Sequence, residues 1–162
     1  MAMTLNIQLA NFDDPALSIF LEEHLAEMAP HSPLESQHAL DLSALRQPTV
    51  QLWVAWKEQR IAGTCALAVL TPGHEELKSM RTDPDFRGQG IASQLLHHVL
   101  ATARARKVDR ISLETGSMEF FAPARALYKK HGFDQCQPFG SYIEDTHSHY
   151  MTRTLHPEPT SR

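Results

Sequence analysis

A glycine-containing turn between a predicted strand and a predicted helix constrains the fold of this chain more than any other feature. Arg87-Gly88-Gln89-Gly90-Ile91-Ala92 follows a strand predicted over 75–82 and leads into an amphipathic helix predicted over 91–107. The first N–H groups of a helix have no partner within the helix, and that end carries a partial positive charge. Glycines at this position leave the backbone open to an anion such as a pyrophosphate. The same glycines would equally serve a tight turn that binds nothing.

Two other phosphate-binding motifs fit this segment poorly. A P-loop requires Gly-Lys followed by Ser or Thr, a combination that the chain does not contain. A dinucleotide fingerprint requires a third glycine where this chain has Ser93, although Glu114 lies at about the right distance for its ribose-binding acid. The preceding strand segment, 76–81, is too polar for the buried central strand of such a unit. The sequence therefore disfavours a dinucleotide-dependent oxidoreductase.

The rest of the pattern predicts an α/β domain with a mixed sheet. Alternating and β-branched residues predict strands over 5–9, 49–56, 61–70, 75–82 and 110–115, with one or two more between 140 and 155. Helical spacing of apolar residues predicts helices over 14–30, 32–46, 91–107 and 120–131. Because residues 57–60 form a tight turn between two strands, we expect a mixed sheet with helices on both faces. One domain is expected over 1–155, followed by a frayed tail over 156–162.

Composition argues against several classes of partner. The chain has 15 Lys and Arg against 19 Asp and Glu, a net charge of −4 that suits nucleic-acid binding poorly. No apolar run approaches the ~20 residues that span a bilayer, so no membrane partner is expected. Residues 1–10 lack the features of a secretory signal, and Cys65 and Cys136 are too few for a disulfide framework, which favours a cytoplasmic protein. The histidines lack metal-ligand spacing, and no metal is expected.

Two segments resemble motifs of the GNAT superfamily of N-acetyltransferases. Residues 80–92 resemble motif A, whose core pattern is Arg/Gln-x-x-Gly-x-Gly/Ala, here Arg87-Gly88-Gln89-Gly90-Ile91-Ala92. Residues 124–133, ARALYKKHGF, resemble the later pattern Ala-x-x-Leu-Tyr-x-x-x-Gly-Phe. The two segments stand in the family's order and at its separation, and the resemblance covers roughly residues 50–135. It implies a GNAT-like fold, in which a mixed, mostly antiparallel sheet contains a splayed pair of strands.

The resemblance also implies an activity and a set of site residues. It implies direct transfer of an acetyl group from acetyl-CoA to a primary amine of a small molecule. The implied cofactor-binding residues belong to the strand before the turn, the turn and the first helical turn: Met80, Thr82, Arg87, Gly88, Gln89, Gly90, Ile91, Ala92 and Ser93. Tyr128 matches the family's general acid, which protonates or hydrogen-bonds the leaving sulfur. Glu76 stands where some members place a general base, and Glu114 on the neighbouring strand is its competitor.

The acceptor site is less defined by the sequence. His31, Glu35 and His38 cluster in a helical region that in the family often walls this site, which makes them candidate substrate contacts. Lys78 and Arg81 could bind a carboxylate on an amino-acid-like acceptor, or they could pair with nearby acidic side chains. An acidic protein also suits a polyamine or a cationic peptide as acceptor.

The chain departs from the family pattern at one visible position. Many members carry an asparagine three residues before the alanine of the second motif, where this chain has Phe121. One polar contact to the cofactor is then missing or replaced, and Ser117 is a candidate replacement. The alternative function is therefore a non-catalytic acyl-CoA-binding sensor on the same fold. A homodimer is an oligomeric state that the sequence leaves open.

Overall fold

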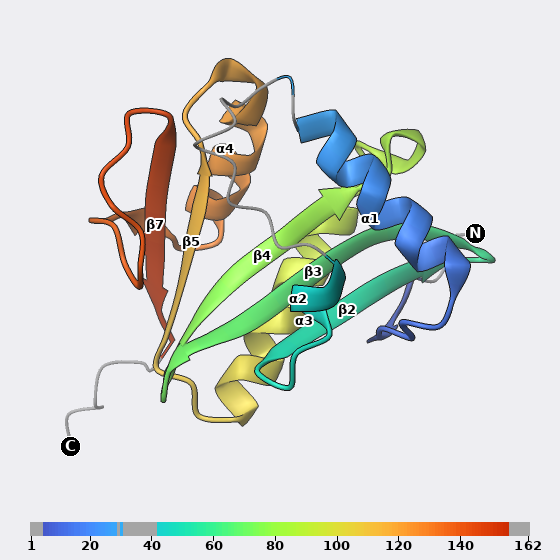
Figure 1. Cartoon of the computed structure of the whole chain (residues 1–162), viewed down its shortest axis with the longest axis horizontal. Helices are drawn as coiled ribbons and strands as arrows, with labels where there is room; N and C mark the ends of the chain where they lie inside the picture. Colours follow the sequence, from blue (N-terminus) through green and yellow to red (C-terminus); the bar gives the residue numbers. More distant parts are fainter. Residues whose placement is uncertain (1–4, 29, 31–41, 156–162) are drawn as a thin grey trace.

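The computed structural model describes residues 5–28, 30 and 42–155, which form one mixed sheet covered by helices on both faces (Figure 1). The strands are β1 (Leu5–Leu9), β2 (Val50–Lys57), β3 (Arg60–Thr71), β4 (His74–Thr82), β5 (Arg110–Gly116), β6 (Asp134–Gln135) and β7 (Ser148–Thr154). Their order in the sheet is β1-β2-β3-β4-β5-β7-β6. All neighbours are antiparallel except β4 and β5, which are parallel. The predicted mixed, mostly antiparallel sheet is confirmed.

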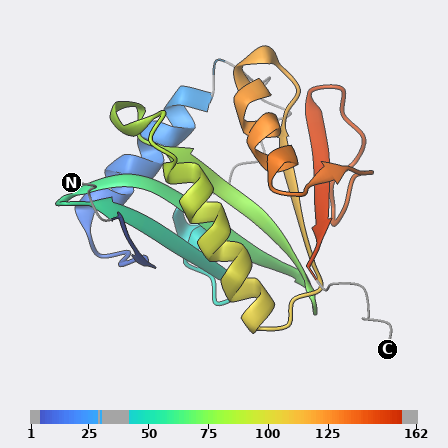
Figure 2. The same cartoon turned by 180° about the vertical axis from the view of Figure 1, so that it is seen from behind.

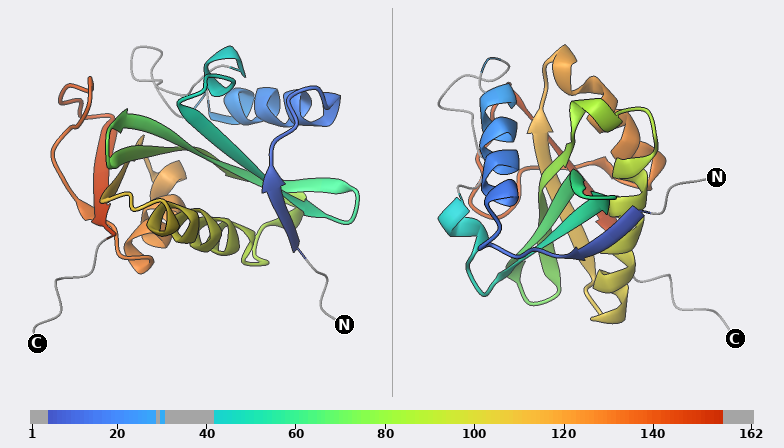
Figure 3. Two further views of the ribbon diagram at one scale, coloured as in Figure 1. Left: turned by 90° about the horizontal axis from the view of Figure 1, so that it is seen from below. Right: turned by 90° about the vertical axis from the view of Figure 1, so that its right-hand side faces the viewer.

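The helices form two layers, one on each side of the sheet (Figures 2 and 3). They are α1 (Pro15–Met28), α2 (Leu42–Leu45), α3 (Ile91–Ala105) and α4 (Ala122–Lys130). The first two cover one side, here called the α1 face, and the last two cover the other, here called the α3 face. This arrangement buries both surfaces of the central strands.

The apolar stripe predicted for the helix after the glycine turn forms the centre of the larger core. Ile91, Leu95, Val99 and Ala103 are all buried against the sheet on the α3 face. Phe133, which follows α4, is fully buried in the same cluster. Burying a large apolar side chain contributes about 1.5–3 kcal/mol, so these contacts hold α3 and the turn before it in place.

The parallel pair β4 and β5 separates towards the top of Figure 1. Their register runs only from His74 opposite Arg110 to Leu77 opposite Leu113. Beyond that point β4 continues to Thr82 and β5 to Gly116 without pairing with each other. The predicted splayed pair is therefore present, and one backbone edge of the second half of β4 pairs with no other strand among the described residues.

Two predicted helices differ in extent from those of the structure, and one short strand was not expected. The helix predicted over 32–46 is described only as α2, because residues 31–41 lie outside the described part of the chain. The helix predicted over 120–131 begins later, at Ala122, after a 3₁₀ turn over Glu119–Phe121. Proline in the first turn explains this start, since its missing N–H is not needed there. The short strand β6 was not predicted, because its two residues are extended only through pairing with β7.

Candidate active site

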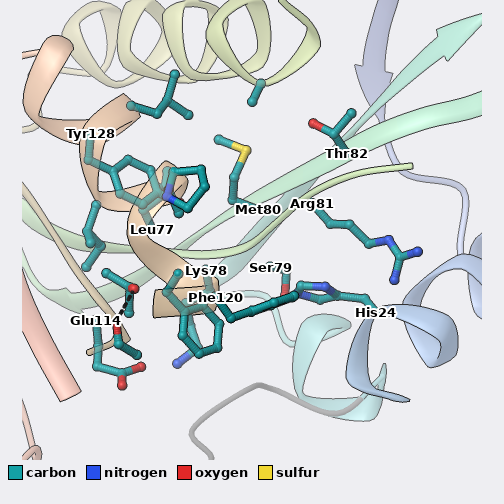
Figure 4. A pocket seen from close by; sticks show the side chains of 18 of the residues that line it. His24, Leu77, Lys78, Ser79, Met80, Arg81, Thr82, Glu114, Phe120 and Tyr128 are labelled. Atoms are coloured by element: carbon teal, nitrogen blue, oxygen red, sulfur yellow. Dashed lines mark hydrogen bonds between the residues drawn. The ribbon is translucent and has the colours of Figure 1, made fainter. Parts of the chain in front are cut away.

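A pocket of about 540 Å³ opens where β4 and β5 separate (Figure 4). Its walls come from α1, β4, the turn before α3, β5, α4 and the loop between β6 and β7. Ten of the predicted site residues line it: Glu76, Lys78, Met80, Arg81, Thr82, Arg87, Gly88, Ala92, Glu114 and Tyr128. Gln89, Gly90, Ile91 and Ser93 lie outside this lining. His31, Glu35 and His38 lie outside the described residues.

The glycine turn presents bare backbone. Gly88 and Gly90 have φ of +78° and +79°, a left-handed conformation that L side chains rarely adopt, and a Cβ added at either would meet nothing within 4 Å. Gly90 is the N-cap of α3 and supplies no side-chain cap, although polar capping residues commonly fill this position. Among the described residues, none accepts a hydrogen bond from the N–H groups of 90–93. The N-terminus of α3 therefore offers a row of free donors below open space.

The side chains around this turn are engaged elsewhere. Arg87 donates from Nη2 to Oε2 of Glu27 in α1, at 2.6 Å. The amide oxygen of Gln89 accepts a hydrogen bond from Lys57 Nζ. Ser93 Oγ lies 2.7 Å from Nε2 of His131, at the end of α4. What the turn offers to a ligand is thus chiefly its backbone.

A bulge in β4 decides which side chains share a face. Cys65 of β3 lies opposite both Ser79 and Met80, and Ser79 has a φ of +55°. In a regular strand, residues three apart point to opposite faces. The extra residue shifts that alternation, so Arg81 reaches the α1 face like Lys78, where its guanidinium lies 5.0 Å from the ring centroid of Phe20.

Glu76 lies in a small polar cluster with two donors. Tyr142 Oη donates to Glu76 Oε2 at 2.5 Å, and Lys78 Nζ lies 3.2 Å from the same oxygen. Lys78 Nζ also donates to Tyr142 Oη at 3.1 Å. Burial, and then the charge of Glu76, raise the pKa of Tyr142, so its phenol remains a donor. Sequence reasoning missed Tyr142, because no local motif marks a loop residue that approaches β4 only in the folded chain.

Glu114, the other candidate general base, has a different hydrogen-bond partner. Glu114 of β5 lines the pocket across the gap from β4, and its Oε2 accepts a hydrogen bond from Ser148 Oγ at 2.8 Å. Both candidate bases therefore face the same space, each held by hydroxyl donors of the C-terminal third of the chain.

Tyr128 reaches the pocket from α4. Its ring is buried and packs edge-on against Phe133, with the centroids 5.8 Å apart. Its hydroxyl has no hydrogen-bond partner among the described residues, although the residue lines the pocket. Burial raises the pKa of this phenol, so it stays protonated and able to donate at neutral pH.

The sequence matches the Acetyltransferase (GNAT) family over residues 15–133. The chain belongs to this family. Among its GNAT relatives, the uncharacterized N-acetyltransferase YedL of Escherichia coli (strain K12) is 43% identical over 149 residues, covering 92% of this chain and 94% of YedL. The uncharacterized N-acetyltransferase YsnE of Bacillus subtilis (strain 168) is 47% identical over 135 residues, covering 83% of this chain and 89% of YsnE. The protein is thus an N-acetyltransferase, and GNAT acetyltransferases take their acetyl group from acetyl-CoA.

A solved structure supports the same fold. The crystal structure assigned as an acyl-CoA N-acyltransferase from Klebsiella pneumoniae subsp. pneumoniae MGH 78578 superimposes with a TM-score of 0.79 at 28% sequence identity. The match covers 94% of this chain and 99% of that one. The GNAT fold expected from the two sequence motifs is therefore confirmed.

The position where this chain departs from the GNAT pattern has a packing explanation. Phe121 lies against the end of β5. The contact is so close that a Cβ added to Gly116 would come within 2.3 Å of the Phe121 ring. Ser117, the suggested replacement contact, donates from its hydroxyl to the carbonyl of Thr146 at 2.8 Å. Phe121 therefore packs on the end of β5 and lines the pocket, and Ser117 ties the end of β5 to the loop before β7.

Two other kinds of feature are absent from the described residues. None of the helices in this part of the chain has the length and apolar character to cross a membrane. Within the same residues, no three His, Cys, Asp or Glu side chains are grouped so that they could hold a metal ion.

Proposed function

We propose that this GNAT N-acetyltransferase transfers an acetyl group directly from acetyl-CoA to a primary amine of a small molecule. The observation that carries the proposal is the row of free N–H groups at the start of α3. Two glycines in this turn leave open space next to the backbone. This row lies beside a pocket that also contains a buried tyrosine and two carboxylates.

The proposed donor site uses two stretches of backbone. The N–H groups of 88–93 bind the pyrophosphate, favoured by the partial positive charge of the α3 N-terminus. The unpaired edge of β4, through the backbone of Met80 and Thr82, pairs with the amide groups of the pantetheine arm as an added strand would. The reactive end of the donor then lies in the gap between β4 and β5.

The proposed chemistry assigns one role to each nearby group. Acetyl-CoA supplies an activated acyl group, whose carbon–sulfur bond breaks as the bond to the acceptor nitrogen forms. Glu76 takes the proton of the attacking amine, directly or through water, and Tyr128 donates a proton to the leaving sulfur. Free backbone N–H groups of β4 stabilise the negative charge that develops on the carbonyl oxygen. Lys78 and Tyr142 orient the Glu76 carboxylate.

Acetyl-CoA is expected to stabilise the protein, whereas NAD is not. At 100 times its Kd, a ligand adds about 2.7 kcal/mol to stability, which raises the Tm of a protein of this size by roughly 5–10 °C. NAD also has a pyrophosphate, but it lacks the pantetheine arm that would pair with β4. Thermal melts with each compound test the donor site, and an equal shift with NAD would contradict it.

Glu76→Gln is expected to lower kcat by about 100-fold or more, because the amine loses its proton acceptor while the shape of the side chain is kept. Glu114→Gln is the matched control and should change kcat little. Both variants should retain the thermal shift with acetyl-CoA. A large loss in Glu114→Gln alone would assign the base to Glu114 and overturn the assignment to Glu76.

The alternative, a non-catalytic acyl-CoA sensor, needs the glycine turn but neither an acid nor a base. Release of the CoA thiol from acetyl-CoA in the presence of a broad amine panel separates the two functions. Amine-dependent release supports the transferase, and release with none of the amines favours the sensor.

A further inference from the structure

We infer that the acceptor carries a carboxylate in addition to its amine, and that this carboxylate binds the guanidinium of Arg81. The substrate class is therefore amino-acid-like, a small molecule with an amine at one end and a carboxylate at the other. This inference rests on the proposed function, because it names the acceptor of that same site.

Arg81 is a buried cation with two donor atoms that no described residue uses. Its side chain is only 6% exposed, and its Nε and Nη1 atoms are buried without a hydrogen-bond partner among the described residues. Nη1 lies 3.4 Å from Oε1 of Glu27, but the pair is not aligned for a hydrogen bond. Buried donors are nearly always paired, and a charged donor loses most when it is not. The unused donors therefore point to a missing acceptor.

The shape of the guanidinium suits a carboxylate. Nε and Nη1 are the two buried atoms without a partner, and Nη2 is not one of them. In any arginine, Nη2 and Nε lie side by side along one edge of the guanidinium. A carboxylate that reaches this edge can accept two parallel hydrogen bonds, a geometry that arginine favours. The ring of Phe20 beneath the guanidinium holds its plane in place.

The charges around Arg81 leave room for one more anion. Glu27 lies between two cations, Arg87 and Arg81. Burial opposes ionisation of Glu27, but the hydrogen bond from Arg87 and its charge outweigh this and lower the pKa of the carboxyl. Burial and then the charge of Arg81 lower the pKa of His24 to about 4, so this ring is neutral at pH 7. Because the hydrogen bond of Glu27 comes from Arg87, this carboxylate leaves the donors of Arg81 for another anion.

The position of Arg81 sets the direction of the acceptor. Figure 4 shows Arg81 and His24 at one end of the pocket, with Tyr128 and Glu114 at the other. A carboxylate on Arg81 therefore directs the amine of the same molecule along β4 towards the carboxylates. Lys78, the other cation considered for this role, has its ammonium group on Glu76 and Tyr142. We assign Lys78 to positioning the base and Arg81 to binding the acceptor.

The test compares acids with their amides as acceptors of the wild-type enzyme. The probes are the common α-amino acids and a series of ω-amino acids of increasing length, each beside its carboxamide, with thiol release as the readout. A charged hydrogen bond to the carboxylate predicts a kcat/KM about 10- to 100-fold higher for the best acid than for its amide. Amides used as well as acids would overturn the inference and leave the proposed function standing. Acetylation of neither series would also overturn it.

Arg81→Gln provides the second arm of the test. This variant should lose the preference for acids over amides while keeping its thermal shift with acetyl-CoA. Arg110→Gln, an arginine of the same sheet outside the pocket lining, should keep both. An unchanged acid preference in Arg81→Gln would overturn the inference, and if the variant does not fold, the wild-type comparison decides alone. Absence of any acetyl-CoA shift in the wild type would instead overturn the proposed donor site.

Discussion

Gly90→Glu is expected to weaken acetyl-CoA binding by about 1000-fold. The new carboxylate would project into the open space above the α3 N-terminus, where the pyrophosphate is proposed to bind. Two like charges 4 Å apart repel by about 4 kcal/mol at an effective dielectric constant of 20, and each 1.4 kcal/mol is a factor of about ten in Kd. Isothermal calorimetry with acetyl-CoA measures the change.

Gly90→Ala is the control for this substitution. Alanine at a φ of +79° carries the same backbone strain, about 1–2 kcal/mol of stability, but adds neither charge nor bulk above the helix. We expect its Kd for acetyl-CoA to change less than about tenfold, since a Cβ there meets nothing within 4 Å. Retained affinity in Gly90→Glu would show that the anion binds elsewhere, and the donor site would have to be abandoned.

Tyr128→Phe is expected to lower kcat by about 100-fold with little change in Kd for acetyl-CoA, because only the proton donor is removed. The hydroxyl has no hydrogen-bond partner among the described residues, and the ring packing on Phe133 is kept, so the Tm should stay nearly constant. Steady-state kinetics, calorimetry and a thermal melt separate these three quantities. Full activity in the variant would remove the acid role.

The raised pKa of Tyr128 also predicts the pH dependence. A phenol whose pKa lies above its ordinary value of 10.0 keeps its proton throughout the neutral and mildly alkaline range. Loss of activity through ionisation of this acid should therefore begin only above about pH 10. A decline near pH 8 that is present in the wild type and absent in Tyr128→Phe would contradict the assignment.

Much of the fold, and the residues of the proposed donor site, could be predicted from the sequence, because local patterns determine them. Gly88 and Gly90 predict the turn, since glycine is the residue type that adopts a positive φ most readily. The stripe from Ile91 to Ala103 marks the buried face of α3, since helical periodicity shows which residues pack together. Tyr128 is predicted from a motif on one short helix, and the structure brings this residue to the same pocket as the turn.

Tertiary structure alone decided the proposed acceptor side of the pocket. The sequence placed Lys78 and Arg81 together, yet the reason they share a face is a bulge at Ser79 that no local pattern announced. Tyr142 meets Glu76 from 66 positions away, and Glu27 meets Arg87 from 60 positions away. Such contacts depend on strand register and on how helices pack across the sheet, and one extra residue in a strand is enough to change them. Local chemistry thus specifies a backbone that can hold an anion, whereas long-range packing determines which side chains line the pocket where the acceptor is proposed to bind.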